Sequence, residues 1–289
     1  MGDRFLALAR SGNHNWQHYL AAVAGLWLFV GLGQLLTQMT QTWLSSISPS
    51  TPLLAQLGGY IAQNLPFLFL LLGLFLVILT IHHRSIRSLV TAAATIHYRR
   101  MAQGLGLWGL LLCLSTLVSS GLALESYQLT ADPVRWLIFL PLVLLLTPMQ
   151  TTTEELLLRG YLLQALSLLT RNRRLLIGLS GLVFALAHLG NPEVSASDDF
   201  LWAILYYFLA GCFPALLTLW DNSLELAIGC HAAQNLFVVL FVRPQSSVLD
   251  TPAIWTSSGG VHFQQGFFFL LVQVLLFCQI VFSAQRKAG

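Results

Sequence analysis

The chain has 289 residues, of which 56% are hydrophobic and only 9% are charged, and its mean hydropathy is +0.73. Soluble globular domains carry about 25% charged residues, so this composition excludes a soluble enzyme, a disordered chain and a secreted disulfide scaffold. The net charge of +3 is too small to indicate a nucleic acid as partner. The sequence therefore predicts an integral protein of a lipid bilayer.

A transmembrane helix needs about 20 mostly apolar residues. The first 18 residues are mixed and polar, unlike a signal peptide, and apolar runs follow them. We predict an all-α bundle of about eight transmembrane helices from eight such runs: 19–36, 65–81, 105–124, 136–146 with an extension towards 169, 175–189, 200–220, 224–242 and 263–282. No internal repeat or second domain is visible, so residues 1–289 are expected to form one membrane domain.

Two stretches do not fit a simple span. The segment 37–64 is rich in Ser, Thr, Gln and Pro, which predicts a loop with room for one interfacial helix. The stretch 134–169 is too long for one span, which predicts a kink or break at Pro141 or Pro148.

The basic residues indicate how the chain crosses the membrane. Of the 14 Lys and Arg residues, eleven fall at the N-terminus, in the second loop, in the fourth loop and at the C-terminus: Arg4, Arg10, Arg84, Arg87, Arg99, Arg100, Arg171, Arg173, Arg174, Arg286 and Lys287. With eight spans these groups share one side, which the positive-inside rule identifies as the cytoplasm. We therefore expect both termini in the cytoplasm, and the compact chain suits a bacterial inner membrane.

Three charged residues interrupt a Leu-rich stretch, TTTEELLLRGYLLQAL. A charge at mid-membrane costs roughly 2.5–3.5 kcal/mol on the insertion scale, and such residues usually face a cavity or each other. Glu155 and Arg159 are four residues apart, so on a helix they share a face and can form an ion pair. Glu154 lies about 100° round the helix, which leaves its carboxyl group without a predicted partner.

Two histidines lie in later apolar runs and are the candidate partners of Glu154. His188 ends the sequence FALAH, in which Phe184 lies one helical turn earlier. His231 opens the sequence HAAQN, and Asn235 follows on the same helical face. We expect these groups to converge on one hydrated pocket.

A carboxylate, two imidazoles and an amide inside a bilayer suffice to hydrolyse a peptide bond. Glu154 could act as the general base that activates water, and His188 could orient the water or protonate the leaving amine. His231 and Asn235 could donate hydrogen bonds to the developing oxyanion. Glu154, His188 and His231 could instead hold a divalent metal such as zinc, although the HExxH signature of zinc proteases is absent.

Together the three motifs resemble those of a known family. EELLLR, FALAH and HAAQN, in this order, resemble EExxxR, FxxxH and HxxxN of the CAAX prenyl endopeptidase and bacteriocin-processing family, also called type II CAAX proteases or Abi proteins. The resemblance covers about 150–241, which is expected to be the catalytic core. Leu158 is a small departure, because members often have Phe there.

The resemblance implies an eight-helix intramembrane endopeptidase. Carried over residue by residue, it makes Glu154 the catalytic base, His188 its partner, and His231 with Asn235 the oxyanion site. It implies a supporting, structural role for three further residues: Glu155, Arg159 and Phe184. It leaves open whether the enzyme is of glutamate type or a metalloprotease, and we favour metal-free chemistry.

Two other classes of function stay open. A transporter or proton pathway would also place Glu and His within the membrane, but it would be expected to show two related halves with broken helices. A non-catalytic scaffold or immunity-type protein would most simply have lost a motif residue, and none is missing. For a protease, the partner would be a peptide or protein at the membrane, such as a prenylated C-terminal motif, a leader peptide, a bacteriocin or a membrane-protein segment.

Overall fold

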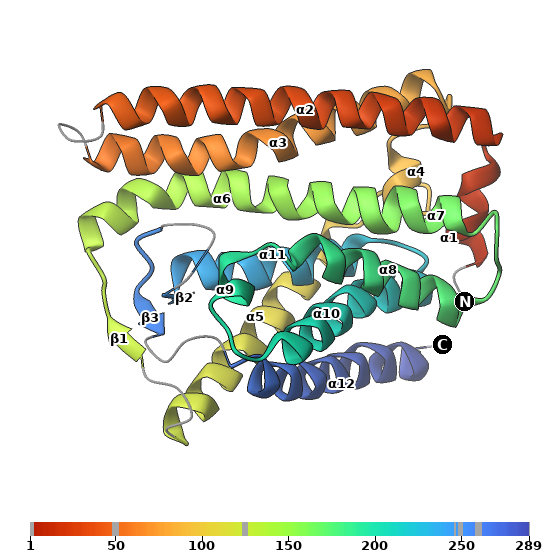
Figure 1. Ribbon diagram of the computed structural model, residues 1–289. Helices are drawn as coiled ribbons and strands as arrows, with labels where there is room; N and C mark the ends of the chain where they lie inside the picture. Colours follow the sequence, from red (N-terminus) through yellow and green to blue (C-terminus); the bar gives the residue numbers. More distant parts are fainter. Residues whose placement is uncertain are drawn as a thin grey trace.

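The structure, a computed structural model, describes residues 3–47, 52–122, 127–245, 247, 251–257 and 262–288, without the side chains of 47 and 284–288. It is mostly helical (Figure 1), as predicted. The helices and helical turns are α1 (Asp3–Ala7), η1 (Leu8–Arg10), α2 (Trp16–Ile47), α3 (Pro52–Thr80), α4 (Arg87–Val90), α5 (Tyr98–Gly121), α6 (Pro133–Glu155), η2 (Leu156–Leu162), α7 (Leu163–Leu166), α8 (Arg173–His188), α9 (Pro192–Ser195), α10 (Phe200–Asp221), α11 (Glu225–Leu240) and α12 (Phe263–Ala288).

Six helical segments are long and apolar enough to cross a membrane: Trp16–Ser46, Pro52–Thr80, Tyr98–Gly121, Pro133–Leu166, Phe200–Asp221 and Phe263–Ser283. The predicted spans 175–189 and 224–242 form α8 and α11, which have only 16 residues each. At 1.5 Å per residue, each extends about 24 Å, which is shorter than the roughly 30 Å hydrocarbon core of a bilayer. The structure therefore supports six spans by length, and the count of eight stays a prediction.

The described parts of the segment 37–64, residues 37–47 and 52–64, are helical rather than a loop, contrary to the prediction. Helix α2 continues to Ile47 and α3 begins at Pro52. Thr37 Oγ1 has two acceptors, the Gly33 carbonyl of its own helix at 3.0 Å and the Ala62 carbonyl of α3 at 2.7 Å, and Thr42 Oγ1 donates a 2.9 Å bond to the Gln38 carbonyl. Because these hydroxyls find acceptors on their own helix or on its neighbour, their polarity does not end the helix.

The predicted break near Pro141 or Pro148 is also wrong. The helix runs through both prolines, and α6, η2 and α7 form one continuous segment, Pro133–Leu166 (Figure 1). The irregular part is the π-helical turn η2, which immediately follows Glu155. Such turns are rare and often occur at functional sites.

A small sheet that the sequence did not predict closes one end of the bundle. It is formed by β1 (Tyr127–Leu129), β2 (Val242–Pro244) and β3 (Trp255–Ser257) in the order β1-β3-β2. Strand β3 pairs antiparallel with β1 and parallel with β2. The strands lie at the end opposite the two chain termini (Figure 1).

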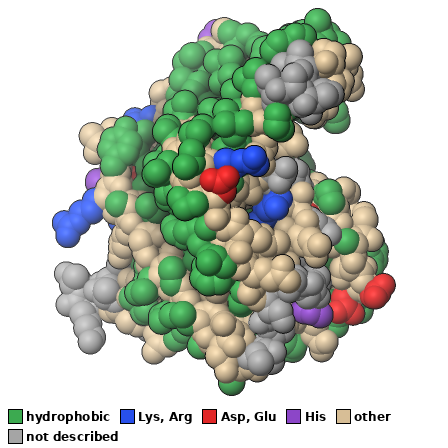
Figure 2. Space-filling model, turned by 90° about the vertical axis from the view of Figure 1, so that its left-hand side faces the viewer, with side chains coloured by type: hydrophobic (Ala, Val, Ile, Leu, Met, Phe, Trp, Pro, Cys, Tyr) green, Lys and Arg blue, Asp and Glu red, His purple; other side chains and the backbone are tan. Residues whose placement is uncertain are grey.

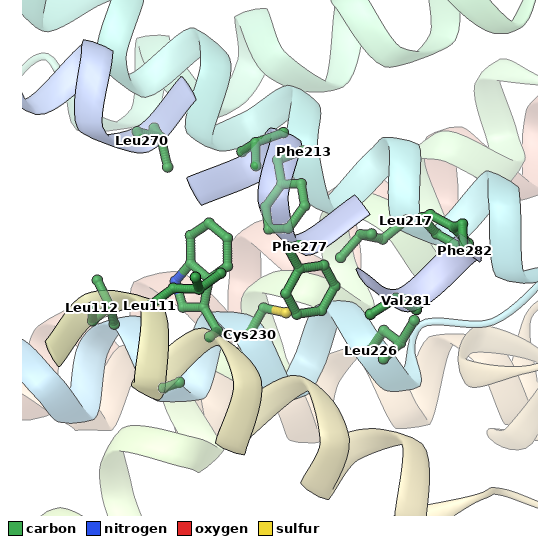
Figure 3. Close-up of a cluster of buried hydrophobic side chains, with 13 residues drawn as sticks. Leu111, Leu112, Phe213, Leu217, Leu226, Cys230, Leu270, Phe277, Val281 and Phe282 are labelled. Carbon is green, nitrogen blue, oxygen red and sulfur yellow. The ribbon is translucent and has the colours of Figure 1, made fainter. Parts of the chain in front are cut away.

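Aromatic side chains form the core between α5, α10, α11 and α12 (Figure 3). Trp108 stacks on Phe213 with ring centroids 4.7 Å apart, and Phe213 meets the edge of Phe277 at 5.6 Å. Helix α11 is buried along most of its length and contacts α5, α6 and α10. The helix that carries His231 is thus held on several sides.

Large apolar side chains also cover the outside of the molecule. Trp27 on α2 is 71% exposed, and Leu145 on α6 is 67% exposed. Figure 2 shows the end that carries the sheet, where hydrophobic side chains cover much of the upper part and charged ones are few. Apolar surface on this scale is expected to face lipid rather than water.

Glycines allow the central helices to approach closely. A Cβ atom on Gly104 of α5 would lie 2.5 Å from the Leu226 carbonyl oxygen of α11, and one on Gly211 of α10 would lie 2.8 Å from the Cα atom of Gly181 on α8. Small residues at such crossings are typical of packed membrane helices.

A buried polar cluster ties the N-terminal segment to η2. His82, at the end of α3, donates from Nδ1 to the Asn13 carbonyl at 2.6 Å and accepts from the Tyr161 hydroxyl at Nε2 at 2.9 Å. Burial lowers the pKa of His82, and the positive charge of Arg84 acts in the same direction, against the Asn13 hydrogen bond. His82 is therefore neutral in the folded protein.

We expect acid to destabilise this cluster. As the pH falls from about 7.5 to about 5.5, the unfolded chain protonates His82 near its usual pKa of about 6.5 before the folded chain does. The contribution of His82 to the free energy of unfolding is thus present above that range and is lost as the pH falls through it. The unfolding midpoint in detergent should drop more on acidification for the wild type than for His82→Gln. Equal drops would contradict the assignment.

Candidate active site

The end of α6 and the turn η2 carry the charged motif EELLLR. Arg159 Nη1 donates to Glu155 Oε1 at 2.8 Å, and neither side chain has any exposed surface. The predicted ion pair is therefore present, and it is fully buried. Because a charge away from water needs a partner and further hydrogen bonds, the surroundings of this pair are constrained.

Arg159 has two further neighbours on other helices. Its Nη2 donates to the Gly211 carbonyl of α10 at 2.8 Å, and its guanidinium carbon lies 5.0 Å from the centre of the Phe184 ring of α8. A Cβ atom on Gly211 would lie 2.6 Å from Cβ of Phe184. The glycine thus lets α8 and α10 come together around the guanidinium.

His231 on α11 connects the two adjacent carboxylates. Its Nδ1 lies 2.7 Å from Glu155 Oε1, the same oxygen that Arg159 binds. Since a carboxylate accepts only, Nδ1 carries a proton in this contact. The other ring nitrogen, Nε2, lies 3.8 Å from Glu154 Oε2.

Glu154 differs from its neighbour in both exposure and partners. Its side chain is 15% exposed, whereas that of Glu155 is fully buried. The prediction left Glu154 without a partner, but Gln150 Nε2, one turn earlier on α6, donates to its Oε1 at 3.4 Å. The charges of Glu155 and Arg159 cancel, so Glu154 contributes the uncompensated negative charge beside His231.

His188, at the end of α8, is fixed by its own helix. Its Nδ1 donates to the Phe184 carbonyl at 2.8 Å, and its ring stacks on that of Phe184 with centroids 4.1 Å apart. The Phe184 ring also meets the His231 ring edge-on at 6.0 Å. The charges of Glu154 and His231 both act on His188. The two histidines and the two carboxylates thus gather around Phe184 and the end of α6.

Asn235 lies one turn beyond His231 on α11 and is half-buried. Its side chain forms no hydrogen bond with another described residue. The residue before it, Gln234, accepts a 3.1 Å bond from the indole of Trp108. The Asn235 amide group therefore lies one turn from the His231 ring without a hydrogen bond to it.

Four residues that the sequence reading did not name complete these surroundings: Gln150, Gly211, Tyr207 and Glu193. Gln150 could have been found, because it lies four residues before Glu154 on the same helix. Gly211 and Tyr207 contact motif residues only through tertiary packing, and Glu193 joins them through Tyr207. No local spacing in the sequence reveals these contacts.

The donor atoms do not gather as a metal site. Among the described residues, no group of three His, Cys, Asp or Glu side chains is arranged to hold an ion. In the candidate set, Nδ1 of His188 and Nδ1 of His231 bind Phe184 and Glu155. If Glu154, His188 and His231 held a metal, the two histidines would bind it through Nε2, with their Nδ1 atoms held by these partners.

A comparison with protein families agrees with this geometry. Residues 133–237 match the family described as type II CAAX prenyl endopeptidase Rce1-like, and this segment contains every residue named from the three motifs. This segment therefore resembles the Rce1-like family, and the resemblance supports a membrane protease that acts on a peptide or protein.

The chain is also similar along its whole length to the uncharacterized protein YyaK of Bacillus subtilis (strain 168). The two are 27% identical over 295 residues, which cover 99% of this chain and 97% of YyaK. The similarity thus extends to the helices outside the Rce1-like segment. No solved structure matches the chain.

We predict that Arg159→Leu destabilises the protein by about 3–5 kcal/mol, because it leaves Glu155 buried without its cation. The measurement is the unfolding midpoint in detergent, and activity should be lost with the fold. Arg171→Leu, at an exposed arginine, is the matched control and should have little effect. If both variants unfold at the same temperature, the buried pair does not stabilise the site.

Proposed function

We propose that this protein is an intramembrane endopeptidase that hydrolyses a peptide bond in or near the bilayer with water activated by Glu154. One observation carries the proposal: of two adjacent carboxylates, Glu155 is bound by Arg159 and His231, whereas Glu154 is partly exposed and lies beside His231 Nε2. A base must be able to reach a water molecule, and the exposed carboxylate meets this need.

In the first step, Glu154 takes a proton from water while the water oxygen attacks the scissile carbonyl carbon. A carbon–oxygen bond forms, and the carbonyl electron pair moves to its oxygen to give a tetrahedral oxyanion. Protonated His231, through Nε2, and the Asn235 amide donate hydrogen bonds to this oxyanion. His188 helps to hold the attacking water through Nε2, because its other ring nitrogen, Nδ1, is hydrogen-bonded to the Phe184 carbonyl.

In the second step, the oxyanion returns its electron pair to carbon and the carbon–nitrogen bond breaks. The leaving amine takes a proton from the Glu154 carboxylic acid, either directly or through His188 Nε2, which passes on the proton that it receives from Glu154. Glu154 is thereby regenerated as a carboxylate. Glu155 and Arg159 stay paired throughout and keep His231 in place through its Nδ1.

We propose eight crossings of the membrane with both termini in the cytoplasm. In Figure 1, α8 runs from the side of the two termini towards α9, and α10 then runs back towards that side. Helix α11 likewise connects the end of α10 to the end that carries the sheet. The two short helices thus complete an even number of crossings, as the distribution of basic residues requires.

The proposed substrates are peptides or protein segments that reach the bilayer, and the proposed host is a bacterial inner membrane. The family name favours a prenylated C-terminal motif as the substrate. A panel for testing substrates would contain this motif, a leader peptide, a bacteriocin and a membrane-protein segment. Each can be presented to the protein in liposomes.

Glu154→Gln should lower kcat for a panel substrate by at least about 100-fold, because the amide keeps the shape of the side chain but cannot take a proton. The measurement is product formation by the purified protein in liposomes. The unfolding midpoint should change little, because Glu154 is partly exposed and its carboxylate lies 3.8 Å from His231 Nε2, longer than the contacts that hold Glu155. Cleavage by the variant at the wild-type rate would refute the assignment of the base.

We also expect hydrolysis without a metal. Cleavage of the same substrate should persist after prolonged treatment with EDTA and with 1,10-phenanthroline, and added zinc should not accelerate it. Loss of activity with a chelator, reversed by one divalent metal, would instead favour Glu154 and the two histidines as ligands.

A further inference from the structure

The imidazole of His188 lies between two aromatic rings. Phe184 covers one face, with centroids 4.1 Å apart and planes at 28°, and Tyr207 of α10 stacks at 4.7 Å and 27°. Phe184 and Tyr207 lie 6.5 Å apart, centroid to centroid, so the three rings form a compact group. Both aromatic side chains are buried.

Tyr207 is itself held by the segment that follows His188. Its hydroxyl donates to Glu193 Oε1 at 2.8 Å, and Asn191 Nδ2 donates to the same oxygen at 2.9 Å. Asn191 and Glu193 lie at the start of the short helix α9. The contact thus joins α10 to the chain immediately after His188.

This arrangement restricts the orientation of the imidazole. A histidine ring rotates about a broad, roughly two-fold torsion, and a half-turn would exchange Nδ1 with Cδ2 and Nε2 with Cε1. The bond from Nδ1 to the Phe184 carbonyl selects one of the two orientations, and the two flanking rings oppose rotation out of that plane. Nε2 is then kept in a fixed direction.

We propose that Tyr207 is a positioning residue for His188, anchored by Glu193, and that its ring keeps Nε2 directed towards the reacting water. This inference rests on the proposed function, because it gives Tyr207 no role apart from that of His188. A misplacement of about 1 Å at a catalytic group can cost roughly 100-fold in rate. Tyr207 contacts His188 through its aromatic ring, so the ring matters more than the hydroxyl for the position of His188.

The test compares two substitutions of Tyr207 in liposomes with a panel substrate that the wild type cleaves. Tyr207→Leu, which removes the ring, should lower kcat about 100-fold while KM changes less than about 3-fold. Tyr207→Phe, which keeps the ring, should restore kcat to within about 10-fold of the wild type. Phe208→Leu, at the next residue of the same helix, which is 37% exposed, is the control and should retain wild-type kcat.

A second comparison separates positioning from general packing. In a His188→Ala background, Tyr207→Leu should cause no further loss of kcat, because residues that act through one another are not additive. A further 100-fold loss in that background, or wild-type kcat for Tyr207→Leu, would overturn the proposal. If Tyr207→Leu does not fold, Tyr207→Met keeps the volume without the ring and should show the same pattern.

The proposed function can fail separately. If Glu154→Gln cleaves as fast as the wild type, the endopeptidase mechanism is wrong regardless of Tyr207. If cleavage depends on Glu154 and His188 but not on the ring at position 207, only the positioning role is wrong.

Discussion

A guanidinium with no exposed surface must be neutralised by groups within its reach, and this requirement organises the centre of the molecule. Arg159 donates hydrogen bonds to one carboxylate of its own helical segment and to one backbone carbonyl of α10. The carbonyl is reachable because Gly211 and Gly181 let α8 and α10 cross closely. The buried charge therefore constrains sequence at positions far from it in the chain, because a larger side chain at the crossing would separate the charge from its acceptor.

The same requirement gives the two adjacent carboxylates, Glu154 and Glu155, different roles. Glu155 satisfies Arg159 and, through the same oxygen, binds His231. This fixes α11 against α6 and directs His231 Nε2 towards Glu154. A single carboxylate could not both neutralise a buried cation and remain available to water. The pair EE thus supplies one structural acid and one reactive acid about 100° apart on the helix.

Much of the site could be predicted from the sequence, because each motif pairs residues at a helical spacing. The i to i+4 spacing of Glu155 and Arg159 is sufficient to predict their ion pair, and that of Phe184 and His188 their stacking. The sequence could not predict Tyr207, because its contact with His188 depends on the crossing of α8 and α10. The fold was less predictable where polar residues bond to their own helix, as Thr37 and Thr42 do in α2.

The helices that carry the two histidines are the two that are too short to span a bilayer by themselves. Helix α11 is buried along most of its length, and a helix surrounded by other helices does not have to match the thickness of the lipid. Helix α8 packs mainly against α10 and exposes Leu182 and Leu186 on its outer side. The chain after α8 also returns polar residues to the site: Glu193 lies only five residues beyond His188 and anchors Tyr207. The difference in length between the helices is therefore part of how an apolar bundle can contain a reactive carboxylate and two imidazoles.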